Sequence, residues 1–183
     1  MFLLHKFFSV GIITLLSIIF YLISKNAGIL QEKITGKFNS FQSFIFEINH
    51  LSSALSPLLI FTFIYTTSYI ILTHFEILSE KISLSKIITS AFIPILLFSI
   101  FYLILINNFA ANIEDLSNKN IKNLKLIFDY TFNDFKQVGY LFWGLFYLIL
   151  FVEIKRRYEV SYWISIVITL IPSLFLLMLI QLI

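Results

Sequence analysis

Five apolar runs divide the chain, and each is long enough to be a membrane-spanning helix. They cover about residues 7–24, 54–75, 87–106, 135–152 and 162–183. About 20 helical residues cross the roughly 30 Å hydrocarbon core of a bilayer, because a helix rises about 1.5 Å per residue. No charged residue stands in the central part of any run. Backbone groups find no water in that layer, so the runs are predicted to be helices.

Two longer connections carry apolar residues at helical spacing. In the first, from Asn26 to His50, these are Phe38, Phe41, Phe44, Ile45 and Ile48. In the second, from Asn112 to Asp134, they are Ile121, Leu124, Phe128, Phe132 and Phe135, and the charged residues lie away from that face. Both patterns predict short amphipathic helices, which either lie in the membrane interface or fold over the bundle as caps.

These elements define the predicted fold class. It is all-α, a polytopic transmembrane helical bundle of about five spans with two amphipathic interfacial segments. We expect residues 1–183 to form a single membrane domain.

Small and hydroxylated residues recur every three or four positions inside three of the runs. The stripes comprise Thr14, Ser17 and Tyr21 in the first run, Thr62, Thr66, Tyr69 and Thr73 in the second, and Ser165, Thr169 and Ser173 in the fifth. Such faces let helices approach closely and form hydrogen bonds, so they predict helix packing. The alternative is a polar pathway between helices. Packing is favoured because ion and proton pathways usually need a charged residue at mid-membrane.

Two prolines, Pro94 and Pro172, lie inside apolar runs. Each removes one helical hydrogen bond, and we predict that each bends its helix.

Composition agrees with a membrane location. Hydrophobic residues form 59% and charged residues 13% of the chain, and the mean hydropathy is +0.94. A soluble domain of this size could not hide so much apolar surface. The net charge of +3 comes from cations scattered between the runs, which suits anionic headgroups better than nucleic acid. We predict the lipid bilayer as a partner and no nucleic acid.

The chain has no motif that predicts catalysis. It contains no cysteine, which excludes a disulfide, a thiolate metal site and a cysteine nucleophile. His74 and Glu76 lie close together, but their pattern is not that of a metalloprotease, and His74 is expected at the headgroup level. There is also no phosphate loop, dinucleotide fingerprint or nucleophile elbow. We predict no catalytic residue, no metal and no cofactor, and hence no enzyme.

Two segments resemble a known family. The stretch from Lys81 to Ile104 leads from polar residues into an apolar run with Pro94 near its middle, and the end of the chain has a charged turn, Glu153 to Ser161, before a final apolar run. Over about residues 50–183 the chain resembles the Yip-domain family of five-span membrane proteins, named after Ypt-interacting proteins. This resemblance implies a non-catalytic protein that acts through partners, and it carries over no site residues.

The leading hypothesis is therefore a membrane adaptor or accessory subunit, with a transporter as one candidate neighbour and with other membrane subunits or further copies of itself as partners. The alternatives are a small transporter or channel component and an organelle-encoded subunit of a respiratory or ATP-synthase complex. The richness in Phe, Ile, Lys and Asn is typical of an AT-rich genome. It favours a bacterial cytoplasmic (inner) membrane, with the mitochondrial inner membrane as the alternative.

Our first prediction concerns the basic turn formed by Lys155, Arg156 and Arg157. This cluster lies in a short connection, where positive charge resists translocation, so we expect it on the cytoplasmic side at the headgroup level with the amino terminus inside. The variant Arg156→Cys places one thiol in a cysteine-free chain. An impermeant thiol reagent added to intact cells should leave it unlabelled, and disruption of the membrane should expose it. Labelling from outside would show the opposite orientation.

Overall fold

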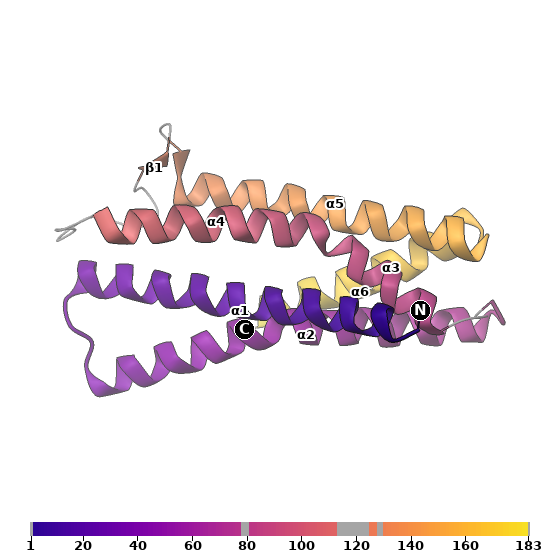
Figure 1. Ribbon diagram of the computed structural model, residues 1–183, viewed down its shortest axis with the longest axis horizontal. Helices are drawn as coiled ribbons and strands as arrows, with labels where there is room; N and C mark the ends of the chain where they lie inside the picture. The colour runs from indigo at the N-terminus through magenta and orange to yellow at the C-terminus, as the bar shows by residue number, and fades with distance from the viewer. Residues whose placement is uncertain (1, 78–80, 113–124, 128–129, 183) are drawn as a thin grey trace. The chain divides into compact units, whose positions relative to one another are not determined.

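The computed structural model describes residues 2–77, 81–112, 125–127 and 130–182 (Figure 1). It contains six α-helices and two short strands within those residues. The helices are α1 (Phe2–Thr35), α2 (Ser40–His74), α3 (Lys81–Ala91), α4 (Ile93–Asn112), α5 (Phe132–Tyr158) and α6 (Tyr162–Leu182). The strands are β1 (Lys125–Ile127) and β2 (Tyr130–Thr131).

Four helical stretches are long and apolar enough to cross a membrane: Phe7–Thr35, Ser40–His74, Leu84–Ala110 and Asp134–Tyr158. They cover the first four predicted spans, apart from Phe75 at the end of the second. The protein is thus a polytopic integral membrane protein, and the predicted all-α class is confirmed. The fifth predicted span forms α6, in which the part from Tyr162 to Pro172 is a shorter apolar helix among the described residues. That α6 crosses the bilayer stays a prediction.

The first predicted amphipathic segment is helical, but it is not a separate helix. Residues 26–35 continue α1, and residues 40–50 begin α2, with only Gly36 to Asn39 between the two helices (Figure 1). With 34 and 35 residues, α1 and α2 each extend over about 50 Å, well beyond the roughly 30 Å hydrocarbon core. The expectation of a separate interfacial helix was wrong, because one unbroken backbone ladder pairs more groups than two short helices do.

The second amphipathic segment was predicted wrongly at residues 125–127 and 130–131, which form strands, whereas Phe132 to Asp134 are helical and begin α5. β1 and β2 pair antiparallel, with Lys125 opposite Thr131 and Ile127 opposite Tyr130. Branched and aromatic side chains such as those of Ile127, Tyr130 and Thr131 favour a strand over a helix. Ile121, Lys122, Leu124, Phe128 and Asp129, which belong to the same prediction, lie outside the described residues.

Two helices begin with reciprocal side-chain caps. At the start of α2, the backbone N–H of Gln42 donates to Asn39 Oδ1 at 2.8 Å, and the backbone N–H of Asn39 donates to Gln42 Oε1 at 3.0 Å. At the start of α5, the N–H of Thr131 donates to Asp134 Oδ2 at 2.7 Å, and the N–H of Asp134 donates to Thr131 Oγ1 at 3.3 Å. Both are capping boxes, and they pair N–H groups that the helix leaves without partners.

The third predicted span is divided into α3 and α4 at Phe92. Pro94 follows two residues later and lacks the N–H that would donate to the carbonyl of Ser90, so the helical hydrogen bonds are interrupted beside this break. That Pro94 bends the span stays a prediction. The N–H of Phe92 reaches the carbonyl of Thr89 at 3.1 Å, a tighter turn than in an α-helix. The ring of Phe92 is buried and lies 4.7 Å from that of Phe146.

The chain forms two compact units, each assembled from separate stretches of sequence. Unit 1 comprises residues Met1–Thr14, Pro57–Pro94 and Trp143–Ile183. The large buried apolar side chains of this unit come from α1, α2, α3, α5 and α6 and from Phe92 between α3 and α4, and they include Ile13, Ile64, Leu72, Leu84, Ile87, Ile88, Phe92, Phe146, Leu150, Ile154 and Ile168. Five hydroxyl side chains, those of Ser9, Ser68, Thr89, Ser165 and Thr169, are buried in the same unit.

Unit 2 comprises residues Leu15–Ser56 and Ile95–Phe142. Leu30 of α1 and Ile106 and Ala110 of α4 form its buried cluster. The Phe98 and Phe142 rings stack at 4.9 Å and join α4 to α5. Unit 2 also holds the turn from α1 to α2, so the two helices return past each other as a hairpin.

Our second prediction concerns Glu159, which follows α5 with a φ of 51°. This left-handed conformation costs a residue with a Cβ about 1–2 kcal/mol. Glycine avoids that cost, but part of the gain is lost because a glycine has more conformational freedom in the unfolded chain. Glu159→Gly should therefore raise the free energy of unfolding by about 0.5–1 kcal/mol, measured by reversible unfolding in mixed micelles. Glu159→Ala removes the same carboxylate and keeps the Cβ, so it should not stabilise. An equal gain in both variants would contradict the conformational explanation.

Candidate functional site

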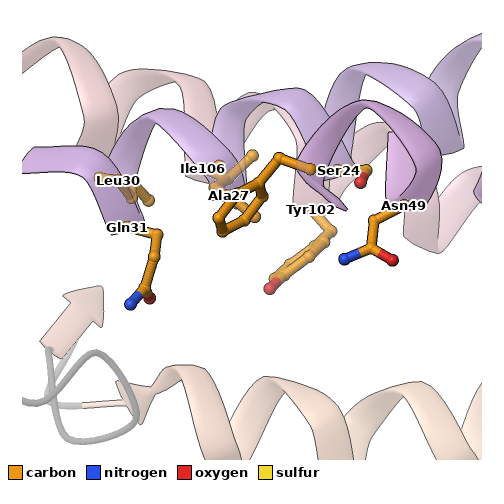
Figure 2. A pocket seen from close by; sticks show the side chains of 9 residues that line it. Ser24, Ala27, Leu30, Gln31, Asn49, Tyr102 and Ile106 are labelled. Atoms are coloured by element: carbon orange, nitrogen blue, oxygen red, sulfur yellow. The ribbon is translucent and has the colours of Figure 1, made fainter. Parts of the chain in front are cut away.

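A pocket of about 310 Å³ lies among α1, α2 and α4 of unit 2 (Figure 2). Its apolar lining consists of Ala27, Gly28, Leu30, Phe46 and Ile106. Leu30 and Ile106 are buried, whereas Ala27 is exposed, so the pocket has a closed apolar floor and an open side. Its volume is at the small end of the range of ligand sites.

Four polar, uncharged side chains complete the lining: Ser24 and Gln31 of α1, Asn49 of α2 and Tyr102 of α4. Figure 2 shows the amide ends of Gln31 and Asn49 and the hydroxyl of Tyr102 extending from their helices on the same side. Together they offer both donors and acceptors of hydrogen bonds. The pocket of about 300 Å³ in unit 1, described below, has three polar lining residues, Ser9, Thr14 and Ser85.

A histidine lies directly behind this lining. Ser24 Oγ is 2.8 Å from His50 Nδ1, and this hydrogen bond joins α1 to α2. The Tyr21 ring meets the His50 ring edge-on at 6.1 Å between centroids, and the Phe46 ring lies 6.3 Å away. The imidazole is therefore held on two sides, and its hydrogen bond fixes the direction of the Ser24 hydroxyl.

The close approach of the two helices depends on Gly28. A Cβ at this position would lie 3.1 Å from His50 Cε1 and 3.4 Å from Phe46 Cδ1. Any larger residue would have to displace the His50 ring. Gly28 is thus the residue that permits the Ser24–His50 hydrogen bond.

Tyr21 belongs to a stripe predicted from the sequence, but its contact with His50 was not predicted. The neighbouring contact of Ser24 with His50 could have been predicted from the distance of each residue from the turn between α1 and α2. Ser24 lies 12 residues before Gly36, and His50 lies 11 residues after Asn39. In a helical hairpin that turns at Gly36 to Asn39, residues equally far from the turn lie opposite each other. Recognising the turn would have paired the two residues.

The predicted stripe of the second run lies on the surface of unit 1. Thr62, Thr66 and Thr73 are exposed, and Tyr69 is half-buried. The hydroxyl of Thr73 donates to the carbonyl of Tyr69 at 2.8 Å within its own helix. The buried face of this part of α2 consists of Ile64, Ser68 and Leu72 instead.

The stripe of the first run is divided among different surroundings. Thr14 lines a second pocket of about 300 Å³ in unit 1, together with Ser9 of α1 and Ser85 of α3. There the Ser85 hydroxyl lies 3.2 Å from Ser9 Oγ. Ser17 is half-buried, and Tyr21 contacts His50 in unit 2.

The stripe of the fifth run lies in the core of unit 1. Ser165 and Thr169 are buried, and the Thr169 hydroxyl donates to the carbonyls of Ser165 and Ile166, both at 3.0 Å. Among the described residues, the hydroxyls of Ser165 and Ser68 are buried without a hydrogen-bond partner. The side chain of Ser173 lies outside the described residues.

The basic turn has local partners on α5 and α6. Lys155 Nζ lies 3.2 Å above the centre of the Tyr162 ring. Arg156 and Arg157 reach the carboxylate of Glu153 at 3.2 and 2.9 Å. These exposed pairs contribute about 0–1 kcal/mol each. They are therefore too weak to cancel the positive charge of the turn. The second proline, Pro172, lies within α6, where its predicted bend stays a prediction.

In the described residues, no three His, Asp or Glu side chains gather where they could hold a metal ion. Comparison of the chain with protein-family models, with curated proteins and with solved structures finds no match.

Our third prediction tests the close approach at Gly28. Gly28→Leu should lower the free energy of unfolding by about 1–3 kcal/mol, because the new side chain overpacks against the His50 and Phe46 rings. The matched control is Gly144→Leu, also within a helix, where a Cβ would meet nothing within 4 Å. It should leave stability unchanged or raise it by up to about 1 kcal/mol, because leucine is the better helix former. Equal losses in the two variants would contradict the role given to Gly28.

Proposed function

We propose that this polytopic membrane protein is a non-catalytic adaptor or accessory subunit that acts through helix–helix contacts in a membrane complex. The observation that supports this most is the exposure of the hydroxyl-bearing face of α2. Thr62 and Thr66 lie on the surface of unit 1, while Ile64 and Ser68, two residues further along in each case, are buried.

This arrangement matters because a lipid tail and a leucine are equally apolar. Helices in a membrane associate through close packing and interhelical hydrogen bonds, and small or hydroxylated residues provide both. A threonine face directed away from its own bundle is therefore suited to the helix of another subunit or of a second copy. The same role is what the resemblance to the Yip-domain family implies.

The transporter alternative receives less support. It needs the stripes of the first, second and fifth runs to line one pathway. In this chain Thr62 and Thr66 are exposed, whereas Ser165 and Thr169 are buried among apolar side chains of unit 1. The polar residues thus do not share one lining.

A bacterial cytoplasmic membrane with the amino terminus inside is the location that we propose for this subunit. It rests on the composition and on the basic turn at Lys155 to Arg157.

Our fourth prediction tests the α2 face directly. Thr66→Cys carries a thiol-reactive photo-crosslinker in native membranes, in a chain with no other cysteine. Illumination should give a discrete adduct of higher mass, and mass spectrometry should identify a membrane protein or a second copy in it. The matched control is Leu148→Cys on α5, whose side chain is 59% exposed and carries no neighbouring hydroxyl stripe. It should react with lipid and give no discrete adduct.

Purification in mild detergent provides an independent measurement. The unmodified protein should co-purify with a partner or as an oligomer. A lone, monodisperse monomer, together with equal cross-linking at positions 66 and 148, would contradict the adaptor function.

A further inference from the structure

We infer that the unit 2 pocket binds a lipid with an uncharged, hydroxyl-bearing headgroup, of the class of the glycosyl diacylglycerols. The inference rests on where the pocket lies along its three helices, on the absence of charge in its lining, and on its division into polar and apolar walls. It is independent of the adaptor function, which rests on the α2 face of unit 1.

The pocket lies where three apolar runs end together. On α1 the apolar run stops at Ser24 and is followed by Lys25 and Asn26, and the α4 run stops at Ile106, before two asparagines. On α2 the apolar sequence resumes only after His50. Polar residues beside long apolar runs mark the boundary between hydrocarbon and headgroups. A pocket built from all three boundaries therefore faces headgroups rather than acyl chains or bulk water.

The chemistry of the lining selects among headgroups. Its polar members are two amides and two hydroxyls, from Gln31, Asn49, Ser24 and Tyr102. Anionic phosphates are usually held by Arg or Lys, and neither lines this pocket. A lysine of the same unit, Lys33, donates to the carbonyl of Ala110 at 2.7 Å. Uncharged groups that both donate and accept hydrogen bonds are suited to sugar or glycerol hydroxyls.

The apolar wall indicates an amphiphile rather than a free sugar. Leu30, Phe46 and Ile106 supply the large apolar side chains of the lining. Figure 2 shows Leu30 and Ile106 set back from the polar ends of Gln31 and Asn49. About 310 Å³ accommodates a headgroup with its glycerol but not two acyl chains.

The fifth prediction is made for the full chain in nanodiscs that contain equal parts of phosphatidylethanolamine, phosphatidylglycerol and monogalactosyl diacylglycerol. Native mass spectrometry should find one retained galactolipid per protein, in preference to the other two. Asn49→Leu and Tyr102→Phe should each reduce its retention about tenfold, because each removes one hydrogen-bonding group from the pocket.

Two matched controls receive the same chemical changes outside the lining. Asn108→Leu alters an exposed asparagine of α4, and Tyr140→Phe alters an exposed tyrosine of α5, both in unit 2. Both should retain the galactolipid. Because Tyr102→Phe is nearly isosteric, it keeps the test valid even where Asn49→Leu impairs folding. Preferential retention of phosphatidylglycerol, equal losses in the controls, or binding of free galactose as tight as that of the lipid would each overturn the inference.

Discussion

Every backbone N–H and C=O group of this chain that enters lipid has to find its partner within the chain, and the described structure follows from that requirement. The helices are long, and two of them begin with capping boxes, at Asn39 and at Thr131, both outside the apolar runs. Inside α2, Pro57 cannot donate to the carbonyl of Ser53, and the hydroxyl of Ser56 donates to it instead at 2.9 Å. The two short strands occur only between spans, where water can pair their free edges.

The same requirement explains what several hydroxyl groups do. Thr73, Thr89, Ser99 and Thr169 all donate to a carbonyl four residues earlier in their own helix. A hydroxyl that is satisfied in this way adds no contact between helices, so a stripe of such residues is a weak indication of packing by itself. Ser24 behaves differently because Gly28 lets α2 approach closely enough for the imidazole of His50 to reach it.

The polar side chains of the two units differ in where they lie and in what they can contact. In unit 1 the buried side chains are mostly large and apolar, and the threonines of α2 are left on the surface, which supports an adaptor that meets another helix. In unit 2 the ends of three apolar runs meet around a pocket whose polar side chains are uncharged. Uncharged polar side chains can be buried at that boundary at a small cost in free energy, because their amide and hydroxyl groups can exchange hydrogen bonds to water for hydrogen bonds to a ligand's hydroxyls.

The sequence by itself determined the membrane class and the approximate place of the spans. The free energy of transfer from water into lipid is enough to determine that a run of about 20 apolar residues inserts into the bilayer. It also contained the Pro94 signal near which α3 ends. Helix lengths were underestimated, since polar residues such as Lys25 and Asn26 interrupt hydropathy without interrupting the backbone ladder of α1. The Thr-x-x-Asp pattern of the capping box at Thr131 is present in the sequence, but it was not used to predict a helix start. Only the tertiary structure decided that Thr66 faces outward and Ser165 inward, and that His50 lies beside Ser24, because helical periodicity defines the faces of a helix but not which face meets a neighbour.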